Sequence, residues 1–179
     1  MTDLDLCYLP ATDAIKQFKA KTLSPVELLD ALIRRAEEVE PVINAFTYRH
    51  FDEAMDKAKK AEAKYASGGR TRALEGLPIG IKDESFIKGK PTSSGSLIMK
   101  DFVADRTSVG NERIMRAGGI VHAPTATPEF SAAFCTQSRL WGATRNPWNP
   151  EFTPGGSSGG TAASLAAGTS TIASGSDIA

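Results

Sequence analysis

Two kinds of residue in this chain could act together on an acyl group: serines within a glycine-rich run, and a lysine that follows an apolar segment. The run is Gly155-Gly156-Ser157-Ser158-Gly159-Gly160, and Lys82 follows Leu77-Pro78-Ile79-Gly80-Ile81. A serine hydroxyl is a weak nucleophile until a neighbouring base removes its proton. A lysine amine becomes such a base when burial lowers its pKa, by up to roughly 3–5 units. The two segments together predict a serine site served by a lysine base.

The glycine–serine run has two other interpretations. Gly/Ser-rich segments are commonly flexible linkers, and glycine-rich turns before a helix can bind phosphate through backbone N–H groups. A linker is less expected here because Trp148 and Pro154 precede the run and the alanine-rich segment 162–167 follows it. A Walker-type phosphate loop requires Gly-Lys-Ser/Thr, whereas Gly159 is followed by Gly160-Thr161. The residues alone leave the linker and the catalytic loop open, with a non-catalytic phosphate-binding module behind them.

Composition excludes several classes of protein. The chain has 179 residues, 41% of them hydrophobic, which is enough for one packed domain. Lys plus Arg and Asp plus Glu both number 21, so the formal net charge is zero and the basic character of a nucleic-acid-binding protein is missing. The sequence has no run of about 20 apolar residues that could cross a membrane, and its start does not resemble a signal peptide. A soluble protein without membrane or nucleic-acid partners is expected.

Cysteines and histidines do not indicate a second chemical site. Cys7 and Cys135 are the only cysteines and form no disulfide framework, which suits the reducing cytoplasm. No spacing of His, Cys or carboxylate residues matches a metal site. We expect His50 on a helical surface and His122 at a strand end as a structural residue. Lys82 is therefore the preferred base, and its ordinary alternative is a solvated lysine at the end of a strand.

The start of the chain is typical of helices. In Ser24-Pro25-Val26-Glu27 the serine can cap a helix, the proline suits its first position and the glutamate completes a capping box. We expect this helix to stop at Pro41. A shorter helix before it is expected to be capped by Thr12 or Asp13, and alanine and charge repeat at helical period over 52–66.

The second part of the chain alternates strand and helix patterns. The expected strands are 77–81, 120–123 and 171–173, and the expected helices are 109–117, 162–167 and one that starts at Thr127-Pro128-Glu129. Such alternation predicts an α/β fold. We expect a helical N-terminal layer over 1–70, and over 71–179 the start of an α/β core in which helices cover part of a mixed sheet. Both belong to the N-terminal portion of a single domain.

Four short motifs, in order, resemble the amidase signature family. The resemblance runs from Leu74 to the last residue, and the helical N-terminus is compatible with it. Each motif alone is weak, but the four in sequence, with Lys82 and Ser157 75 positions apart, are specific. The motifs are Gly76-Leu77-Pro78-Ile79-Gly80-Ile81-Lys82-Asp83, Thr144-Arg145-Asn146-Pro147-Trp148, the run from Pro154 to Gly160, and Gly175-Ser176-Asp177-Ile178.

The resemblance implies a Ser-cisSer-Lys triad. It assigns the lysine role to Lys82 and the bridging cis-serine role to Ser157, with Ser158 as a structural neighbour. The family places its nucleophilic serine four positions after the aspartate that matches Asp177. That is position 181, two residues beyond Ala179. The family commonly has glycine where this chain has Ala179. We therefore expect the 179-residue chain to lack the nucleophile and to be inactive alone.

Further roles follow from the same resemblance. Backbone N–H groups around Ile178 and Ala179 are expected to contribute to an oxyanion hole, and Ser131 is expected to contact substrate, although an ordinary helix position is an equal alternative. The implied reaction is hydrolysis of a carboxamide to a carboxylic acid and an amine or ammonia, through an acyl-enzyme. It needs no metal or cofactor. The expected partner is a small-molecule amide, and the enzyme is expected to be cytoplasmic and able to form a homodimer.

One related activity stays open. The same motifs also resemble those of the A subunit of glutamyl-tRNA amidotransferase, which passes ammonia to an aminoacyl-tRNA within a complex. Nucleic acid would be a partner in that case. The segment Thr127-Pro128-Glu129-Phe130 looks more like the free-standing amidases, because the amidotransferase chain tends to carry aspartate in place of the proline–glutamate pair.

Overall fold

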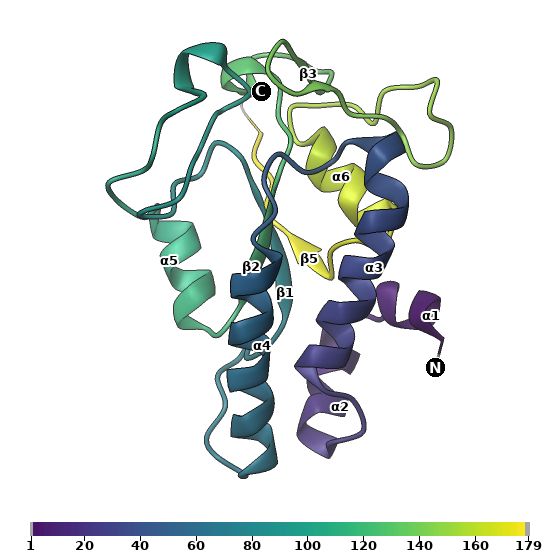
Figure 1. Cartoon of the computed structure of the whole chain (residues 1–179), viewed down its shortest axis with the longest axis vertical. Helices are drawn as coiled ribbons and strands as arrows, with labels where there is room; N and C mark the ends of the chain where they lie inside the picture. Colours follow the sequence, from purple (N-terminus) through teal and green to yellow (C-terminus); the bar gives the residue numbers. More distant parts are fainter. Residues whose placement is uncertain (1, 178–179) are drawn as a thin grey trace.

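The computed structural model describes residues 2–177, which form an α/β fold. Figure 1 shows the strands at the centre of the molecule, with helices around them. The predicted fold class and the helical N-terminal layer are confirmed. That layer consists of α1 (Asp3–Cys7), α2 (Ala11–Ala20), α3 (Pro25–Ile43) and α4 (Phe51–Ala66).

The main sheet has three strands in the order β2-β1-β5. The central strand β1 (Pro78–Lys82) runs parallel to both β2 (Ile120–Thr125) and β5 (Ile172–Ala173). Every residue of β1 and β2 is buried, which is typical of parallel strands covered on both faces. A separate antiparallel pair is formed by β3 (Gln137–Ser138) and β4 (Gly142–Ala143). Because β1 lies between two neighbours, its last residue reaches the carboxyl edge of the sheet in a fixed position.

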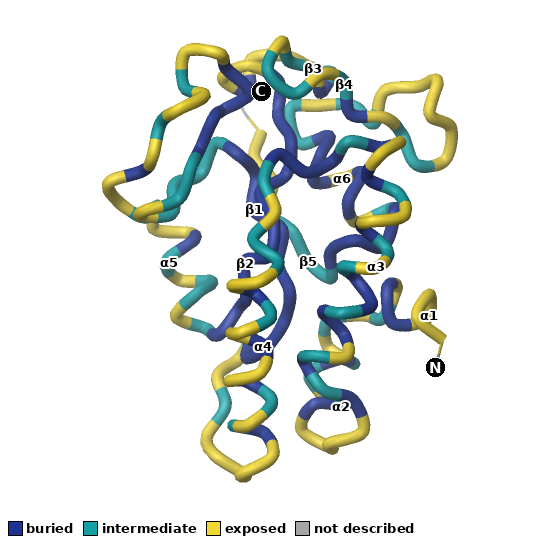
Figure 2. Tube along the Cα trace, viewed as in Figure 1, coloured by how far each residue is buried: buried dark blue, intermediate teal, exposed yellow. Residues whose placement is uncertain are grey.

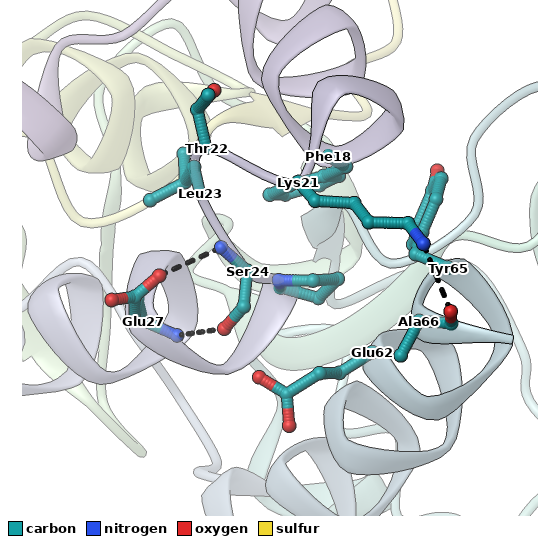
Figure 3. A pocket seen from close by; sticks show the side chains of 10 residues that line it. Phe18, Lys21, Thr22, Leu23, Ser24, Glu27, Glu62, Tyr65 and Ala66 are labelled. Atoms are coloured by element: carbon teal, nitrogen blue, oxygen red, sulfur yellow. Dashed lines mark hydrogen bonds between the residues drawn. The ribbon is translucent and has the colours of Figure 1, made fainter.

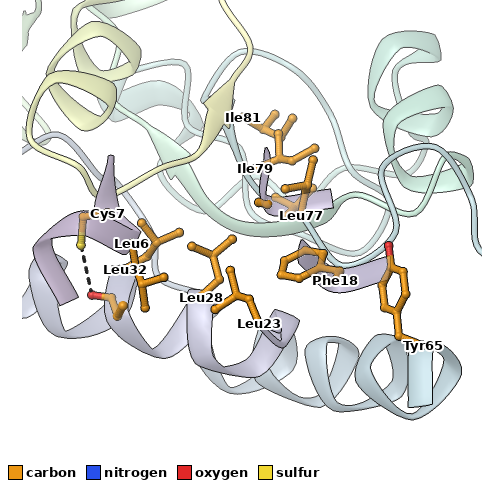
Figure 4. Packing of buried hydrophobic residues seen from close by; sticks show 13 residues of the cluster. Leu6, Cys7, Phe18, Leu23, Leu28, Leu32, Tyr65, Leu77, Ile79 and Ile81 are labelled. Carbon is orange, nitrogen blue, oxygen red and sulfur yellow. Dashed lines mark hydrogen bonds between the residues drawn. The ribbon is translucent and has the colours of Figure 1, made fainter. Parts of the chain in front are cut away.

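The largest hydrophobic cluster joins the helical layer to the sheet. Leu28 and Leu32 of α3 and Ile79 and Ile81 of β1 belong to it, together with Phe18 of α2 (Figure 4). Figure 2 shows buried backbone along β1 and β2 and exposed backbone at the outer turns of the helices. Burial of each such side chain contributes about 1.5–3 kcal/mol. The same cluster therefore stabilises the fold and fixes β1.

The capping box that begins α3 forms as predicted, but two helix boundaries in this layer are wrong. α3 continues for two residues past Pro41. A proline near the end of a helix removes only one late N–H donor, so its cost is small. In addition, the Glu40 carboxylate accepts two backbone N–H groups beyond the helix end. α2 is preceded by Pro10, whose φ of −57° suits a helix start, so neither Thr12 nor Asp13 is its cap.

The chain after β2 also departs from expectation. No α-helix starts at Thr127; the segment forms one 3₁₀ turn, η2 (Glu129–Ser131). Phe130 and Ser131 have φ values of 51° and 56°, and Phe130 N donates to Ser94 O at 2.8 Å. This contact with a distant loop outweighs the local helix-start signal. The remaining helical elements of the described residues are η1 (Leu97–Met99), α5 (Val109–Arg116) and α6 (Gly159–Ala166).

The helix α6 starts three residues earlier than predicted, inside the glycine run. Gly159 and Gly160 are buried in its first turn. A Cβ atom on Gly160 would lie 2.3 Å from Ala126 N, so only glycine allows the helix to approach the end of β2 this closely. The run is therefore part of the folded core, and the linker interpretation is wrong.

Candidate active site

Lys82 ends β1 at the carboxyl edge of the sheet, where α/β folds commonly bind ligands. Its side chain is only 2% exposed. The amine Nζ donates to Ser157 Oγ at 2.6 Å and to Ser176 Oγ at 2.7 Å. The backbone N–H of Lys82 donates to Ser174 Oγ at 3.0 Å. The alternative of a solvated lysine is therefore wrong, and the amine lies between two serine hydroxyls.

Ser157 is held by the loop that leads into α6. Its peptide bond with Gly156 is cis. Thr136 Oγ1 donates to Gly155 O at 3.0 Å and accepts from Gly159 N at 2.9 Å, so one side chain holds both ends of the loop. A Cβ atom on Gly156 would lie 2.9 Å from Cys135 N. The glycines thus let the loop lie against residues 133–136 and direct Ser157 toward Lys82.

Lys82, Ser157 and Ser176 form one hydrogen-bonded cluster, the lysine group. Sequence reasoning gave Ser176 no role in it. It belongs to one of the four motifs, but the signal for its contact with Lys82 lies in the tertiary fold. Ser158 fixes the segment: its Oγ accepts from Ser176 N and donates to Ser176 O, both at 3.1 Å. This agrees with the structural role predicted for Ser158.

The surroundings act on the pKa of Lys82 in two directions. Burial lowers this pKa from its ordinary value, since a charged amine is costly away from water. The carboxylate of Glu84 lies 3.6 Å from Nζ and opposes the shift, as does the charge of Asp177. Burial prevails, so a larger fraction of Lys82 is neutral near physiological pH than of an exposed lysine. A neutral amine in contact with a hydroxyl can accept its proton.

Ser131 lies beside this group rather than in contact with Lys82. Its hydroxyl donates to Glu84 Oε2 and shares a 2.8 Å hydrogen bond with Thr127 Oγ1. The residue is 3% exposed. Its predicted contact with substrate stays a prediction. The predicted oxyanion-hole residues Ile178 and Ala179 lie outside the described residues.

Asp83 fixes the chain on the other side of Lys82. Its carboxylate accepts from Ser93 N at 3.0 Å and from the Ser93 hydroxyl. Ser93 Oγ in turn accepts from Trp141 Nε1 at 2.8 Å. Burial raises the pKa of Asp83 to about 6. The network joins the end of β1 to two later loops and so restrains the backbone that carries Lys82.

The two histidines stand apart from the lysine group. His122 lies within β2, not at its end, and its Nε2 is 2.9 Å from Thr169 O, as suits a structural residue. The expectation that His50 lies on a helical surface is wrong. It precedes α4, is half-buried and donates its backbone N–H to His122 O. The backbone pairing with β2 draws it inward.

A cavity of about 300 Å³ lies away from the lysine site. Figure 3 shows it beside the turn from α2 to α3, where Lys21 Nζ donates to Ala66 O at 2.9 Å at the end of α4. None of its lining residues contacts Lys82.

In residues 2–177 no cluster of three His, Cys, Asp or Glu side chains could hold a metal ion. No helix in the same range is long and apolar enough to cross a membrane.

Known proteins match this chain over most of its length. A family model described as Amidase matches residues 27–179. The A subunit of the glutamyl-tRNA(Gln) amidotransferase from Synechococcus sp. (strain CC9605) is 38% identical over 162 residues, which cover 90% of this chain and 33% of that protein. The indoleacetamide hydrolase of Bradyrhizobium diazoefficiens is 38% identical over 168 residues, which cover 94% of this chain and 32% of that protein.

Solved structures share the fold. A fatty acid amide hydrolase superposes with a TM-score of 0.93 and 27% identity, covering 99% of this chain and 32% of its own. A bacterial aryl acylamidase, described as an amidase signature enzyme, superposes with a TM-score of 0.87 and 30% identity, covering 93% of this chain and 35% of its own. The chain spans about a third of the length of the curated relatives it matches. Together these matches show that the chain belongs to the amidase signature family.

Proposed function

We propose that this chain provides the base and the bridging serine of an enzyme that hydrolyses a small carboxamide. Lys82 is the base and Ser157 the bridge. The nucleophile is a serine at position 181, two residues beyond Ala179. The observation that carries the proposal is the 2.6 Å contact from Lys82 Nζ to Ser157 Oγ, made by an amine that is almost fully buried.

The proposed proton path is short. Neutral Lys82 accepts the proton of Ser157 while Ser157 accepts that of the nucleophile, which attacks the amide carbonyl. The carbonyl oxygen takes the negative charge and Lys82 the positive charge. The path then runs in reverse to protonate the leaving amine or ammonia, and water releases the acid from the acyl-enzyme. Proton transfer of this kind contributes about 10²–10⁴-fold to a rate.

Ammonia transfer to an aminoacyl-tRNA is the second candidate. The Synechococcus amidotransferase chain is as identical to this chain as the Bradyrhizobium hydrolase, at 38%. The first chemical step is shared, because both begin with cleavage of a carboxamide. Release of ammonia from glutamine and copurification of partner subunits would favour the amidotransferase. Hydrolysis of an aryl or alkyl amide without partners would favour the free-standing enzyme.

A chimera tests the catalytic roles. Residues 1–179 replace the matching third of the Bradyrhizobium indoleacetamide hydrolase, and release of ammonia from indoleacetamide is measured. We expect Lys82→Ala and Ser157→Ala each to lower kcat/KM by about 10²–10⁴-fold. Lys88→Ala is the matched control, since Lys88 is an exposed lysine in the loop after β1. A folded Lys82→Ala chimera that keeps the activity of the unmutated chimera would overturn the proposal.

A second measurement uses the 179-residue chain and does not depend on folding of the chimera. Lysines labelled with ¹³C at the ε-carbon are titrated by NMR, and the Lys82 resonance is assigned by its loss in Lys82→Met. The proposal requires this amine to titrate below the exposed lysines, because burial disfavours its charged form. Titration of Lys82 together with the exposed lysines would contradict its role as a base.

A further inference from the structure

Glu84 lies next to the lysine group, and the proton path proposed above does not use it. Its Oε2 atom is 3.6 Å from Lys82 Nζ, and the same atom accepts the hydroxyl of Ser131. The Glu84 side chain is 25% exposed, whereas that of Lys82 is 2% exposed. This ion pair is therefore shielded from water mainly on the lysine side.

The position of the carboxylate is fixed from two directions. The backbone turns sharply after β1, where Glu84 N and Ser85 N both donate to Lys82 O, at 2.8 and 3.0 Å. Ser131 comes from η2, a separate segment, and its own hydroxyl is held by Thr127 at 2.8 Å. Hydrogen bonds and the charge of Lys82 outweigh burial and lower the pKa of Glu84, so the group stays ionised at neutral pH.

We propose that Glu84 is a positioning residue that acts through Lys82: its carboxylate stabilises the ammonium that Lys82 becomes on taking the proton of Ser157. The inference rests on the proposed function. The proton step leaves one positive charge on Nζ and one negative charge on the substrate oxygen. An ionised carboxylate 3.6 Å from Nζ favours the positive charge, more strongly in this shielded place than in water. Ser131 then serves the site by holding Glu84.

The carboxylate also balances the effect of burial. A general base works best when its pKa lies near the working pH, so an amine that loses too much basicity no longer takes the proton. Among the charged groups that act on Lys82, Asp177 has the same sign as Glu84, while Ser157 and Ser176 are neutral partners. The carboxylate of the adjacent Asp83 is directed to Ser93 instead.

Titration of Lys82 by the NMR method above tests this inference. In Glu84→Gln we expect the Lys82 midpoint to fall by about one pH unit or more, the size of effect that an opposite charge within 4–6 Å has. Glu84→Asp keeps the charge and should leave the midpoint nearer that of the unmutated chain. Glu129→Gln is the matched control: its carboxylate is exposed, accepts from Ser96 Oγ at 2.6 Å, and should not affect Lys82.

Ser131→Ala provides an independent variant if Glu84→Gln does not fold. This change leaves the Glu84 charge in place but removes the hydroxyl that donates to the carboxylate. It should lower the Lys82 midpoint, by less than Glu84→Gln does. The inference is overturned if both variants leave the midpoint unchanged, or if Glu129→Gln shifts it as far as Glu84→Gln does. The proposed function instead fails on the midpoint of the unmutated chain and on the Lys82→Ala chimera, so the two failures are distinct.

Discussion

At the scale of single residues, Lys82 and His122 are two buried titratable groups in unlike surroundings. The lysine contacts two hydroxyls and faces a carboxylate. The His122 ring contacts Phe46 edge-on, with centroids 5.6 Å apart, and stacks on Phe51 at 6.4 Å. Its Nε2 lies 2.9 Å from a backbone carbonyl. Burial lowers the pKa of His122 to about 4. The first site can pass a proton, and the second resists taking one.

His122 should make stability depend on pH. Its pKa is about 4 in the folded chain and 6.5 ordinarily, so between these values the unfolded chain binds a proton that the folded chain does not. Stability is therefore lost as pH falls from 6.5 toward 4, by about 3 kcal/mol in all. In His122→Gln, which keeps a donor for Thr169 O, this loss should be absent. Urea unfolding at pH 7 and pH 4.5 measures it. An equal difference between variant and unmutated chain at both pH values would contradict the prediction.

At the scale of elements, what the sequence predicts depends on how local the signal is. The capping box of α3 and the apolar strand β1 are local patterns, and both form as predicted. The helix expected from Thr127 fails because Phe130 bonds to Ser94, more than thirty residues earlier in the chain. The contact of Lys82 with Ser157 followed from motifs, whereas the contacts with Ser176 and Glu84 depend on packing that no pattern in the sequence records.

Two helix-starting glycines should respond oppositely to alanine. A Cβ on Gly160 in α6 would lie 2.3–2.7 Å from backbone atoms of Ala126 and Ala45, so Gly160→Ala should destabilise the chain by about 3 kcal/mol or more. A Cβ on Gly110 in α5 would meet nothing within 4 Å, so Gly110→Ala should stabilise it by ~0.5–1 kcal/mol. Denaturant midpoints measure both. Equal effects of the two changes would show that the contact of α6 with β2 is not tight.

At the scale of the whole molecule, the strands β1 and β2 form its centre. Both are buried along their full length and pair in parallel, and the helical layer covers them. The pair β3 and β4 is peripheral, with only half-buried or exposed residues. The turn at 146–153 likewise has no buried residue.

Hydrogen exchange should follow this division. We expect the amides of Ile79 and Val121 to exchange only on global unfolding, because opening them requires separation of the central strands. Amides at 146–153 should exchange by local opening, at rates independent of a stabilising change such as Gly110→Ala. Mass-spectrometric or NMR exchange at several denaturant concentrations separates the two modes. Exchange of both regions with one common free energy would show that the chain opens as a single unit.

The pairing order of the main sheet has a consequence for the nascent chain. β1 leaves the ribosome early. β5, and the two serines that contact Lys82 Nζ at the end of β1, follow 75 to 94 residues after Lys82. At about 5–20 residues per second, that interval lasts several seconds. Until these serines are in place, the amine of Lys82 lacks the two hydroxyl partners that it has in the folded chain. Among the strands of residues 2–177, the last to be synthesised is thus the one that completes the surroundings in which the pKa of Lys82 is lowered.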